Sequence, residues 1–93
     1  MPKAVWNDTV IAESDATELV EGNHYFPPEA VNMDVLTLTD RHTACPWKGQ
    51  ASYYTINANG EQLVNAAWTY LTPKDAASNI TKHVAFDRRV TVS

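Results

Sequence analysis

The sequence predicts a mainly β fold of antiparallel sheets, with one short helix near residues 73–80. Three observations support this fold class. Short apolar runs that alternate with polar residues occur along most of the chain, as is typical of strands with one buried face. Pairs of turn-forming residues, such as Asn59-Gly60, separate several of these runs. Only the segment that begins at Thr72-Pro73 carries the signals of a helix start.

The first part of the chain predicts two hairpins, each made of two apolar runs around a polar turn. Residues 4–6 and 9–12 flank Asn7-Asp8, and residues 17–20 and 24–26 flank Gly22-Asn23. Pro27-Pro28 then ends the second hairpin, because proline has no N–H to donate to a neighbouring strand.

The strongest hairpin signal lies in the middle of the chain. A strand is expected at residues 35–38, where apolar residues alternate with threonine. Residues 51–57 then lead into Asn59-Gly60, and residues 61–70 return. Asn-Gly suits a type I′ turn, because both central residues of that turn need a positive φ.

The helix predicted near residues 73–80 has a complete start signal. Thr72 suits the capping position, Pro73 the first helical position, and Asp75 the first turn. Its expected apolar face consists of Ala76, Ala77 and Ile80. Residues 84–86 and 90–92 follow as the last two strands.

Composition and charge limit the function classes. A chain of 93 residues, 44% hydrophobic and 19% charged, predicts one globular domain over residues 1–93. The net charge is −4 and the basic residues form no stripe, so we expect no nucleic-acid partner. No apolar run is long enough to cross a bilayer, and residues 1–6 do not resemble a signal peptide. The lone cysteine fits a reducing compartment, so we expect a cytoplasmic protein without a membrane partner.

The segment Cys45-Pro46-Trp47-Lys48-Gly49 is the most informative motif. Pro46 restricts its own φ and favours an extended conformation at Cys45, while Gly49 allows a turn that other residues resist. We therefore expect Cys45, Trp47 and Lys48 to be displayed on a stiff loop, where functional groups are often found.

Several segments together resemble one family, in order and over nearly the whole chain. They are Tyr25-Phe26-Pro27-Pro28-Glu29, Met33-Asp34, Cys45 to Gly49 with Ala51-Ser52-Tyr53-Tyr54, Ala66-Ala67-Trp68-Thr69-Tyr70, and Val84-Ala85-Phe86. These segments resemble the domain-of-unknown-function family 427. The resemblance implies a small β-tent-like domain, in which two antiparallel sheets lean together and leave a pocket between them. Many domains of that shape hold a structural zinc through several cysteines, whereas this chain has a single cysteine.

Cys45 is the candidate for catalysis. A nucleophilic cysteine needs a depressed pKa, and Lys48 and His42 lie close to it in sequence. The alternative is a small buried hydrophobe at a turn. A metal site would need His24, His42 and His83 to converge with Cys45, and their spacing does not suggest this. We therefore expect no metal and no cofactor.

Aromatic residues are concentrated in the same motifs. Tyr53 and Tyr54 are adjacent on a predicted strand and face opposite sides, whereas Trp68 and Tyr70 share a face. Phe26 and Phe86 are expected in the core. The rings with polar tips suit the walls of a pocket. The expected ligand-binding residues are Tyr25, Trp47, Lys48, Tyr54 and Trp68.

Three functions follow from these patterns. The leading hypothesis is a small-molecule-binding domain with an aromatic pocket around the Cys45–Gly49 loop, in which Lys48 anchors a polar group. The second is a small enzyme that uses Cys45 or Lys48. The third is a protein-interaction module with an open groove or an exposed apolar patch. The identity of the ligand and the oligomeric state stay open.

Overall fold

Three antiparallel sheets make up most of the structure, a computed structural model that describes residues 1–93. The strands are β1 (Lys3–Trp6), β2 (Thr9–Glu13), β3 (Glu18–Val20), β4 (Asn23–Tyr25), β5 (Leu36–Cys45), β6 (Gly49–Ala58), β7 (Glu61–Thr69), β8 (Val84–Phe86) and β9 (Thr91–Val92). Three short 3₁₀ helices accompany them: η1 (Pro28–Ala30), η2 (Met33–Val35) and η3 (Asp75–Ile80). None of these helices is long and apolar enough to cross a membrane.

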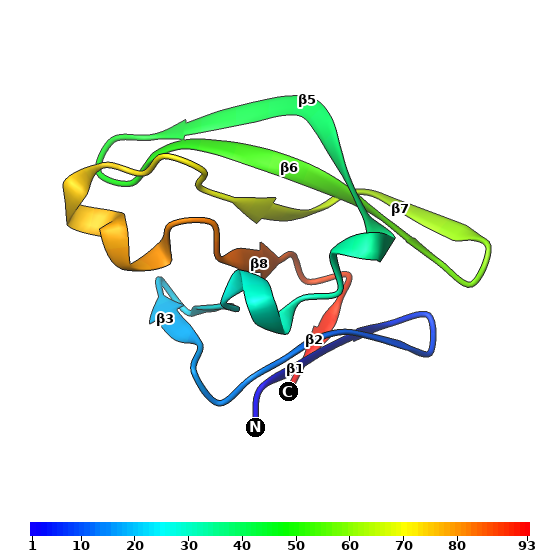
Figure 1. Cartoon of the computed structure of the whole chain (residues 1–93). Helices are drawn as coiled ribbons and strands as arrows, with labels where there is room; N and C mark the ends of the chain where they lie inside the picture. The colour runs from blue at the N-terminus through cyan, green and yellow to red at the C-terminus, as the bar shows by residue number, and fades with distance from the viewer.

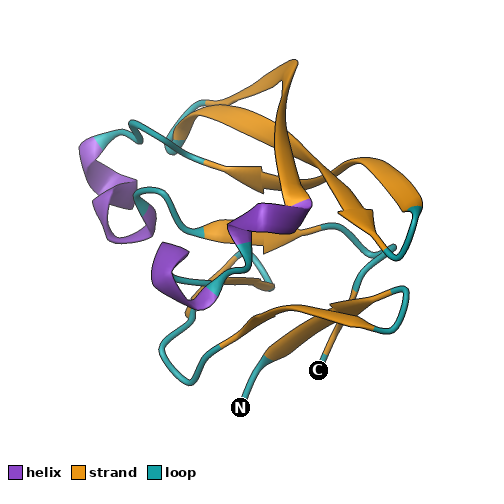
Figure 2. Ribbon diagram, turned by 45° about the vertical axis from the view of Figure 1, so that its right-hand side comes forward, coloured by secondary structure: helices purple, strands orange, loops and turns teal.

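The sheets lean together in a β-tent-like arrangement. The largest sheet has the order β5-β6-β7-β8, the second has the order β2-β1-β9, and β3 pairs with β4 alone. Figure 1 shows β5, β6 and β7 above β1 and β2, with the two termini close together at the bottom. Figure 2 shows one short helix at the left edge of the molecule and the other two between the upper and the lower strands. The predicted fold class is therefore confirmed.

Three hairpins have the two-residue turns that the sequence favours. Their central residues, Asn7-Asp8, Glu21-Gly22 and Asn59-Gly60, all have positive φ, between 49° and 81°. Turns of this kind match the right-handed twist of the strands that they join. All three predicted hairpins are present, although the second turn is centred on Glu21-Gly22 rather than on Gly22-Asn23.

The Cys45–Gly49 segment forms the turn of a fourth hairpin. Cys45 ends β5 and pairs with Gly49, so β5 is much longer than the predicted strand at residues 35–38. A later segment of the chain contacts this turn: the backbone N–H of Lys74 donates a hydrogen bond of 2.8 Å to the carbonyl of Lys48. Gly49 has a φ of +110°, which suits glycine. Residues 46–48 form a turn, as expected, but Cys45 belongs to a strand, and Lys48 is nearly buried rather than displayed.

The helix predicted near residues 73–80 is present as η3, with a different geometry. It is a 3₁₀ helix with a non-helical residue at Ala77, and it starts after Lys74 without a side-chain cap from Thr72. A 3₁₀ helix has about three residues per turn, so positions three apart lie on one side. Ala77 and Ile80 are accordingly buried, whereas Ala76 is exposed.

Two hydrophobic clusters cover opposite faces of the large sheet. The main core joins this sheet to β1 and β2, and includes Ile11, Ile56, Phe26 and Phe86. The rings of Phe26 and Phe86 meet edge to face with their centroids 5.8 Å apart, so both are core residues as expected. The smaller cluster consists of Tyr25, Ala51, Tyr70, Ala77, Ile80 and Ala85. It joins the other face of the sheet to β4 and η3 and supports the site described next.

Candidate functional site

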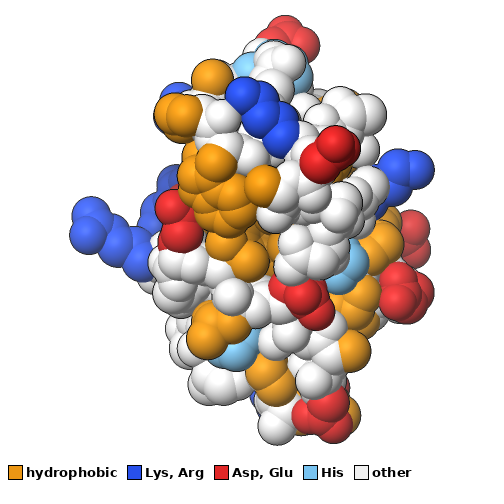
Figure 3. All heavy atoms as spheres, turned by 90° about the vertical axis from the view of Figure 1, so that its left-hand side faces the viewer, with side chains coloured by type: hydrophobic (Ala, Val, Ile, Leu, Met, Phe, Trp, Pro, Cys, Tyr) orange, Lys and Arg blue, Asp and Glu red, His pale blue; other side chains and the backbone are white.

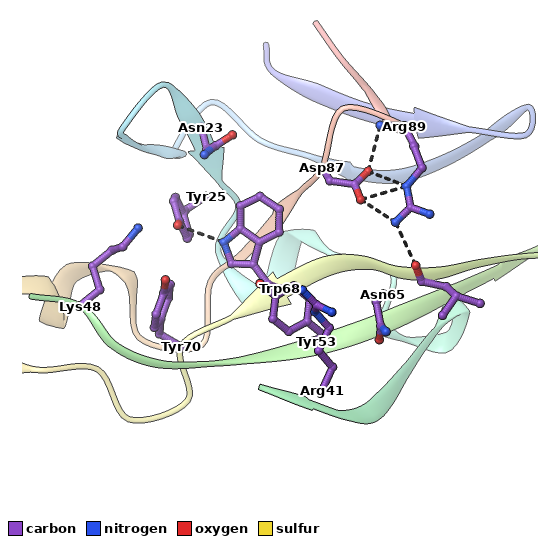
Figure 4. Close-up of a pocket in the computed structure, with 11 residues that line it drawn as sticks. Asn23, Tyr25, Arg41, Lys48, Tyr53, Asn65, Trp68, Tyr70, Asp87 and Arg89 are labelled. Atoms are coloured by element: carbon purple, nitrogen blue, oxygen red, sulfur yellow. Dashed lines mark hydrogen bonds and ion pairs between the residues drawn. The ribbon is translucent and has the colours of Figure 1, made fainter. Parts of the chain in front are cut away.

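A cavity of about 580 Å³ lies over the large sheet and extends to β4. Its volume is within the roughly 300–1,000 Å³ typical of small-molecule sites. The residues that line it come from β4, from the β5–β6 hairpin, from β7 and from the segment after β8. They are Asn23 and Tyr25 of β4, Arg41 of β5, Lys48 of the β5–β6 turn, Tyr53 of β6, Val64, Asn65 and Trp68 of β7, Tyr70 just after β7, and Asp87 and Arg89 after β8. Figure 4 shows Lys48 near one end of this set and Asp87 with Arg89 at the other, with Trp68 between them.

The aromatic part of the wall is built by strand pairing. Tyr53 on β6 and Trp68 on β7 are directly paired, and their ring centroids lie 6.4 Å apart. Trp68 and Tyr70 are two positions apart and so face the same side. Tyr25 approaches from β4: its hydroxyl oxygen accepts a hydrogen bond of 3.1 Å from Nε1 of Trp68, and its ring centroid is 6.4 Å from that of Tyr70. These contacts hold the rings in place before any ligand binds.

Lys48 supplies a nearly buried cation at the edge of the aromatic wall. The residue is only 6% exposed, and Nζ donates to the carboxylate of Glu21. Nζ also lies 5.3 Å from the ring centroid of Tyr70 and 5.5 Å from that of Trp47. Burial by itself would lower the pKa of Lys48. The hydrogen bond to Glu21 and the electrostatic attraction of Tyr25, Tyr70 and Glu21 together outweigh burial and raise the pKa. Lys48 therefore stays protonated at neutral pH.

The other charged groups of the cavity differ in their partners. Arg89 donates to the Asp87 carboxylate from Nε at 3.0 Å and from Nη2 at 2.6 Å, and also to the carbonyl of Val64 at 2.9 Å. The bond to Val64 ties the segment after β8 to β7. Arg41 is exposed and has no carboxylate within 4.0 Å; its guanidinium lies 5.0 Å from the ring centroid of Tyr53.

Two bulges shape the sheet beneath the cavity. In β5, the pairing shifts between Leu38 and His42, so residues 39–41 face a single residue of β6. In β7, a second irregularity places Asn65 at a positive φ of 53°. Such bulges re-aim side chains and are common beside functional sites. Here the side chains concerned are Arg41 and Asn65, both of which line the cavity.

Three of the predicted ligand-binding residues meet in the cavity, and two do not. Tyr25, Lys48 and Trp68 line it. Tyr54 belongs to the main core and is 9% exposed, so the expectation that it forms a pocket wall is corrected: its neighbour Tyr53 has this place. Alternation puts the two tyrosines on opposite faces but does not say which face is the core. Trp47 lies outside the cavity and is 40% exposed.

Residues that the sequence analysis did not select complete the cavity. Tyr70 had a usable signal, because it shares a strand face with Trp68. Arg41 and Asn65 had none, because their positions depend on bulges. Asp87 and Arg89 reach the cavity through the packing of a later segment.

The candidate catalytic and metal-binding residues stay apart. Cys45 is half-buried, packs against the smaller cluster and does not line the cavity. Each histidine has a separate local hydrogen-bond partner: Thr17 for His24, Ala51 for His42 and Thr81 for His83. No three His, Cys, Asp or Glu side chains are grouped as metal ligands.

The exposed apolar surface is a separate feature. Large apolar side chains with high exposure include Leu19, Trp47 and Leu71. Figure 3 views the end of the molecule that carries η3, where apolar side chains gather beside acidic and basic ones. This is the kind of surface that the interaction hypothesis requires.

Comparison with known proteins identifies the family. A comparison with curated proteins found no match. The sequence model of a family described as Domain of unknown function (DUF427) matches residues 2–93, which is nearly the entire chain. The chain therefore belongs to the DUF427 family.

Proposed function

We propose that this protein binds a small molecule in the cavity over the large sheet. The observation that carries the proposal is the convergence of four amphipathic rings, Tyr25, Tyr53, Trp68 and Tyr70, on one hollow beside the ammonium group of Lys48. Small-molecule sites typically combine apolar or aromatic walls with a few fixed polar groups. The Trp68–Tyr25 hydrogen bond supports the proposal, because a wall that is already ordered lowers the entropic cost of binding.

Two features favour binding over catalysis by Cys45 or Lys48. The Cys45 side chain does not line the cavity, so a ligand seated there would not meet the thiol. Lys48 has a raised pKa and keeps its proton, which suits a cation that attracts a polar group rather than a base or a nucleophile. Both features support a binding domain.

The test uses the indole N–H signals of the three tryptophans as internal reporters. Indole, phenol, benzoate and phenyl phosphate are added in turn at millimolar concentration to ¹⁵N-labelled protein. We expect at least one probe to shift the Trp68 signal in a saturable way, because Trp68 lines the cavity. Trp47 and Trp6 lie outside it and serve as controls; the variants Trp68→Phe and Trp47→Phe assign the signals.

Two results would contradict the proposal. If none of the probes shifts Trp68, the cavity is not a binding site for small aromatic molecules. If only Trp47 responds, the exposed surface of the turn is the binding region, and the protein-interaction module becomes the better explanation. A saturable response of Trp68 with a smaller response of Trp47 is the expected outcome.

We also propose the cytoplasm as the compartment. The single cysteine is not in a disulfide, and a reducing environment suits a free, half-buried thiol. Fractionation of cells that express the full chain would test this: most of the protein is expected in the cytoplasmic fraction, and recovery with membranes would contradict it.

A further inference from the structure

Arg41 differs from the other cations of the cavity. Lys48 is paired with Glu21, and Arg89 is paired with Asp87. The guanidinium of Arg41 has neither a salt-bridge partner nor a hydrogen-bond acceptor in the protein; only its backbone N–H is bonded, to Oγ1 of Thr39 at 3.3 Å. All the side-chain donors of Arg41 are therefore free to meet a ligand.

The fold holds this guanidinium in a defined place. Residues 39–41 form the bulge of β5 opposite Tyr53, and the Arg41 guanidinium lies over the Tyr53 ring at 5.0 Å from the centroid. A guanidinium stacked on an aromatic face keeps its N–H edges available for a carboxylate or a phosphate. Figure 4 shows Arg41 and Tyr53 together on the same side of the cavity as Trp68.

A neutral donor lies on the same wall. Asn65 uses its side-chain Oδ1 to accept a hydrogen bond of 2.6 Å from Oγ1 of Thr39. The Nδ2 group of Asn65 makes no hydrogen bond within the protein, so its donors are available to a ligand. Thr39 thus links Asn65 to the bulge that carries Arg41, and both residues line the cavity.

We propose that the ligand of this cavity is an anion with a flat apolar body. Its carboxylate or phosphate group pairs with Arg41, and its body lies against Tyr53 and Trp68. This inference rests on the proposed function and adds the chemical class of the ligand. The protein as a whole carries a net charge of −4, so it repels anions in general, and the attraction must come from local cations such as Arg41.

The experiment compares two anions with a neutral molecule of similar shape. Benzoate, phenyl phosphate and benzyl alcohol are titrated separately, and the Trp68 indole signal reports binding. We expect both anions, or one of them, to bind more tightly than benzyl alcohol. Added sodium chloride should weaken the binding of the anions but not that of benzyl alcohol, because salt screens exposed charges. Whichever of the two anions binds with the higher affinity then shows whether the site prefers a carboxylate or a phosphate.

Variants link the effect to Arg41. We expect Arg41→Gln to weaken binding of the preferred anion by roughly tenfold, the scale of one hydrogen bond to a charged group. Binding of benzyl alcohol should not change. Arg41→Lys should restore part of the affinity, because it keeps the charge but lacks the planar fork. Arg88→Gln is the matched control, since Arg88 is exposed and lies outside the cavity.

The possible failures are distinguishable. If benzyl alcohol binds as tightly as the anions, or if Arg41→Gln and Arg88→Gln behave alike, the ligand is not an anion held by Arg41, and the proposed binding function stands without this inference. If neither anion moves the Trp68 signal of the unaltered protein but indole or phenol does, only this inference is wrong. If no probe of either series moves that signal, both proposals are wrong. An unchanged thermal midpoint of Arg41→Gln confirms that a loss of affinity is not a loss of folding.

Discussion

Thr69 carries the one buried side-chain oxygen or nitrogen of the chain that lacks a hydrogen-bond partner. The residue is fully buried on β7, between Ser52 on one neighbouring strand and Val84 on the other. Folding removes its hydroxyl from water and offers no acceptor or donor in return. We therefore predict that Thr69→Val, which keeps the branched shape, stabilises the protein.

The size of this effect follows from the burial of Thr69. An unsatisfied buried hydroxyl costs about 1–3 kcal/mol, and the new methyl group adds a favourable transfer term. Allowing for imperfect packing of valine, we expect a gain in the free energy of unfolding of about 1–2 kcal/mol. For a domain of this size such a gain raises the thermal midpoint by roughly 5–15 °C.

The facing strand offers a matched control. Thr55 is also buried, at 8% exposure, but its Oγ1 accepts a hydrogen bond of 3.3 Å from the backbone N–H of Asn65. The same substitution, Thr55→Val, leaves that N–H without a partner and should cost about 1–3 kcal/mol. Urea denaturation of both variants measures the two effects. A shift of the midpoint reports a change in stability when the dependence of the unfolding free energy on urea concentration stays the same. A lower midpoint for Thr69→Val would refute the reasoning, because it would show that the Thr69 hydroxyl makes a stabilising bond.

Three further predictions concern the turn, the alkaline limit and the tryptophans. Gly60→Val should lower stability by at least about 1 kcal/mol in thermal unfolding, because Gly60 has a φ of +79°, which valine adopts only with strain. A Cβ at this position would meet no other atom, so the backbone strain is the whole effect. An unchanged thermal midpoint would contradict this turn. Burial raises the pKa of Tyr54 and of Tyr70, so both stay neutral in the folded protein. The contribution of these two pKa shifts to the free energy of unfolding is present below the unfolded pKa of about 10 and is lost as pH rises through the folded pKa. Stability should therefore fall above about pH 10, and it should fall less steeply in the variant Tyr54→Phe than in the unaltered protein. Trp47→Leu should change stability by no more than about 0.5 kcal/mol, because Trp47 is exposed. Trp68→Leu should still fold but should lose about 1–3 kcal/mol of stability, because it removes the hydrogen bond to Tyr25. Circular dichroism and denaturation measure both variants, and equal losses would argue against the different placements of the two rings.

Local chemistry made the strand and turn pattern predictable. Asn59-Gly60 and Asn7-Asp8 tolerate positive φ, so the hairpins could be placed without any knowledge of the rest of the chain. The helix near residues 73–80 was predictable in place for the same reason. Its 3₁₀ geometry and the non-helical conformation of Ala77 were not, because the start signal marks where a helix begins and not which type of helix forms.

The candidate site was predictable only in part. Tyr25, Lys48 and Trp68 were expected to bind a ligand, and they do lie together on one cavity. Tyr54 was assigned to the wrong face, because alternation along a strand separates neighbours without saying which side meets the second sheet. Only the packing of β1 and β2 against the large sheet decides that Tyr54 is in the core and Tyr53 in the cavity.

The fold class and three of the four hairpins could be read from the sequence, because turn propensity and alternation act between residues close in the chain. The family followed from the resemblance of several motifs, and the family match confirms it. The tertiary structure alone decided the electrostatics of the cavity. Lys48 is buried because Glu21, from a distant hairpin, supplies its counter-charge. Arg41 is free because a bulge turns it onto Tyr53 and away from any carboxylate. Such relations join residues far apart in sequence, and they exist only once the sheets have packed.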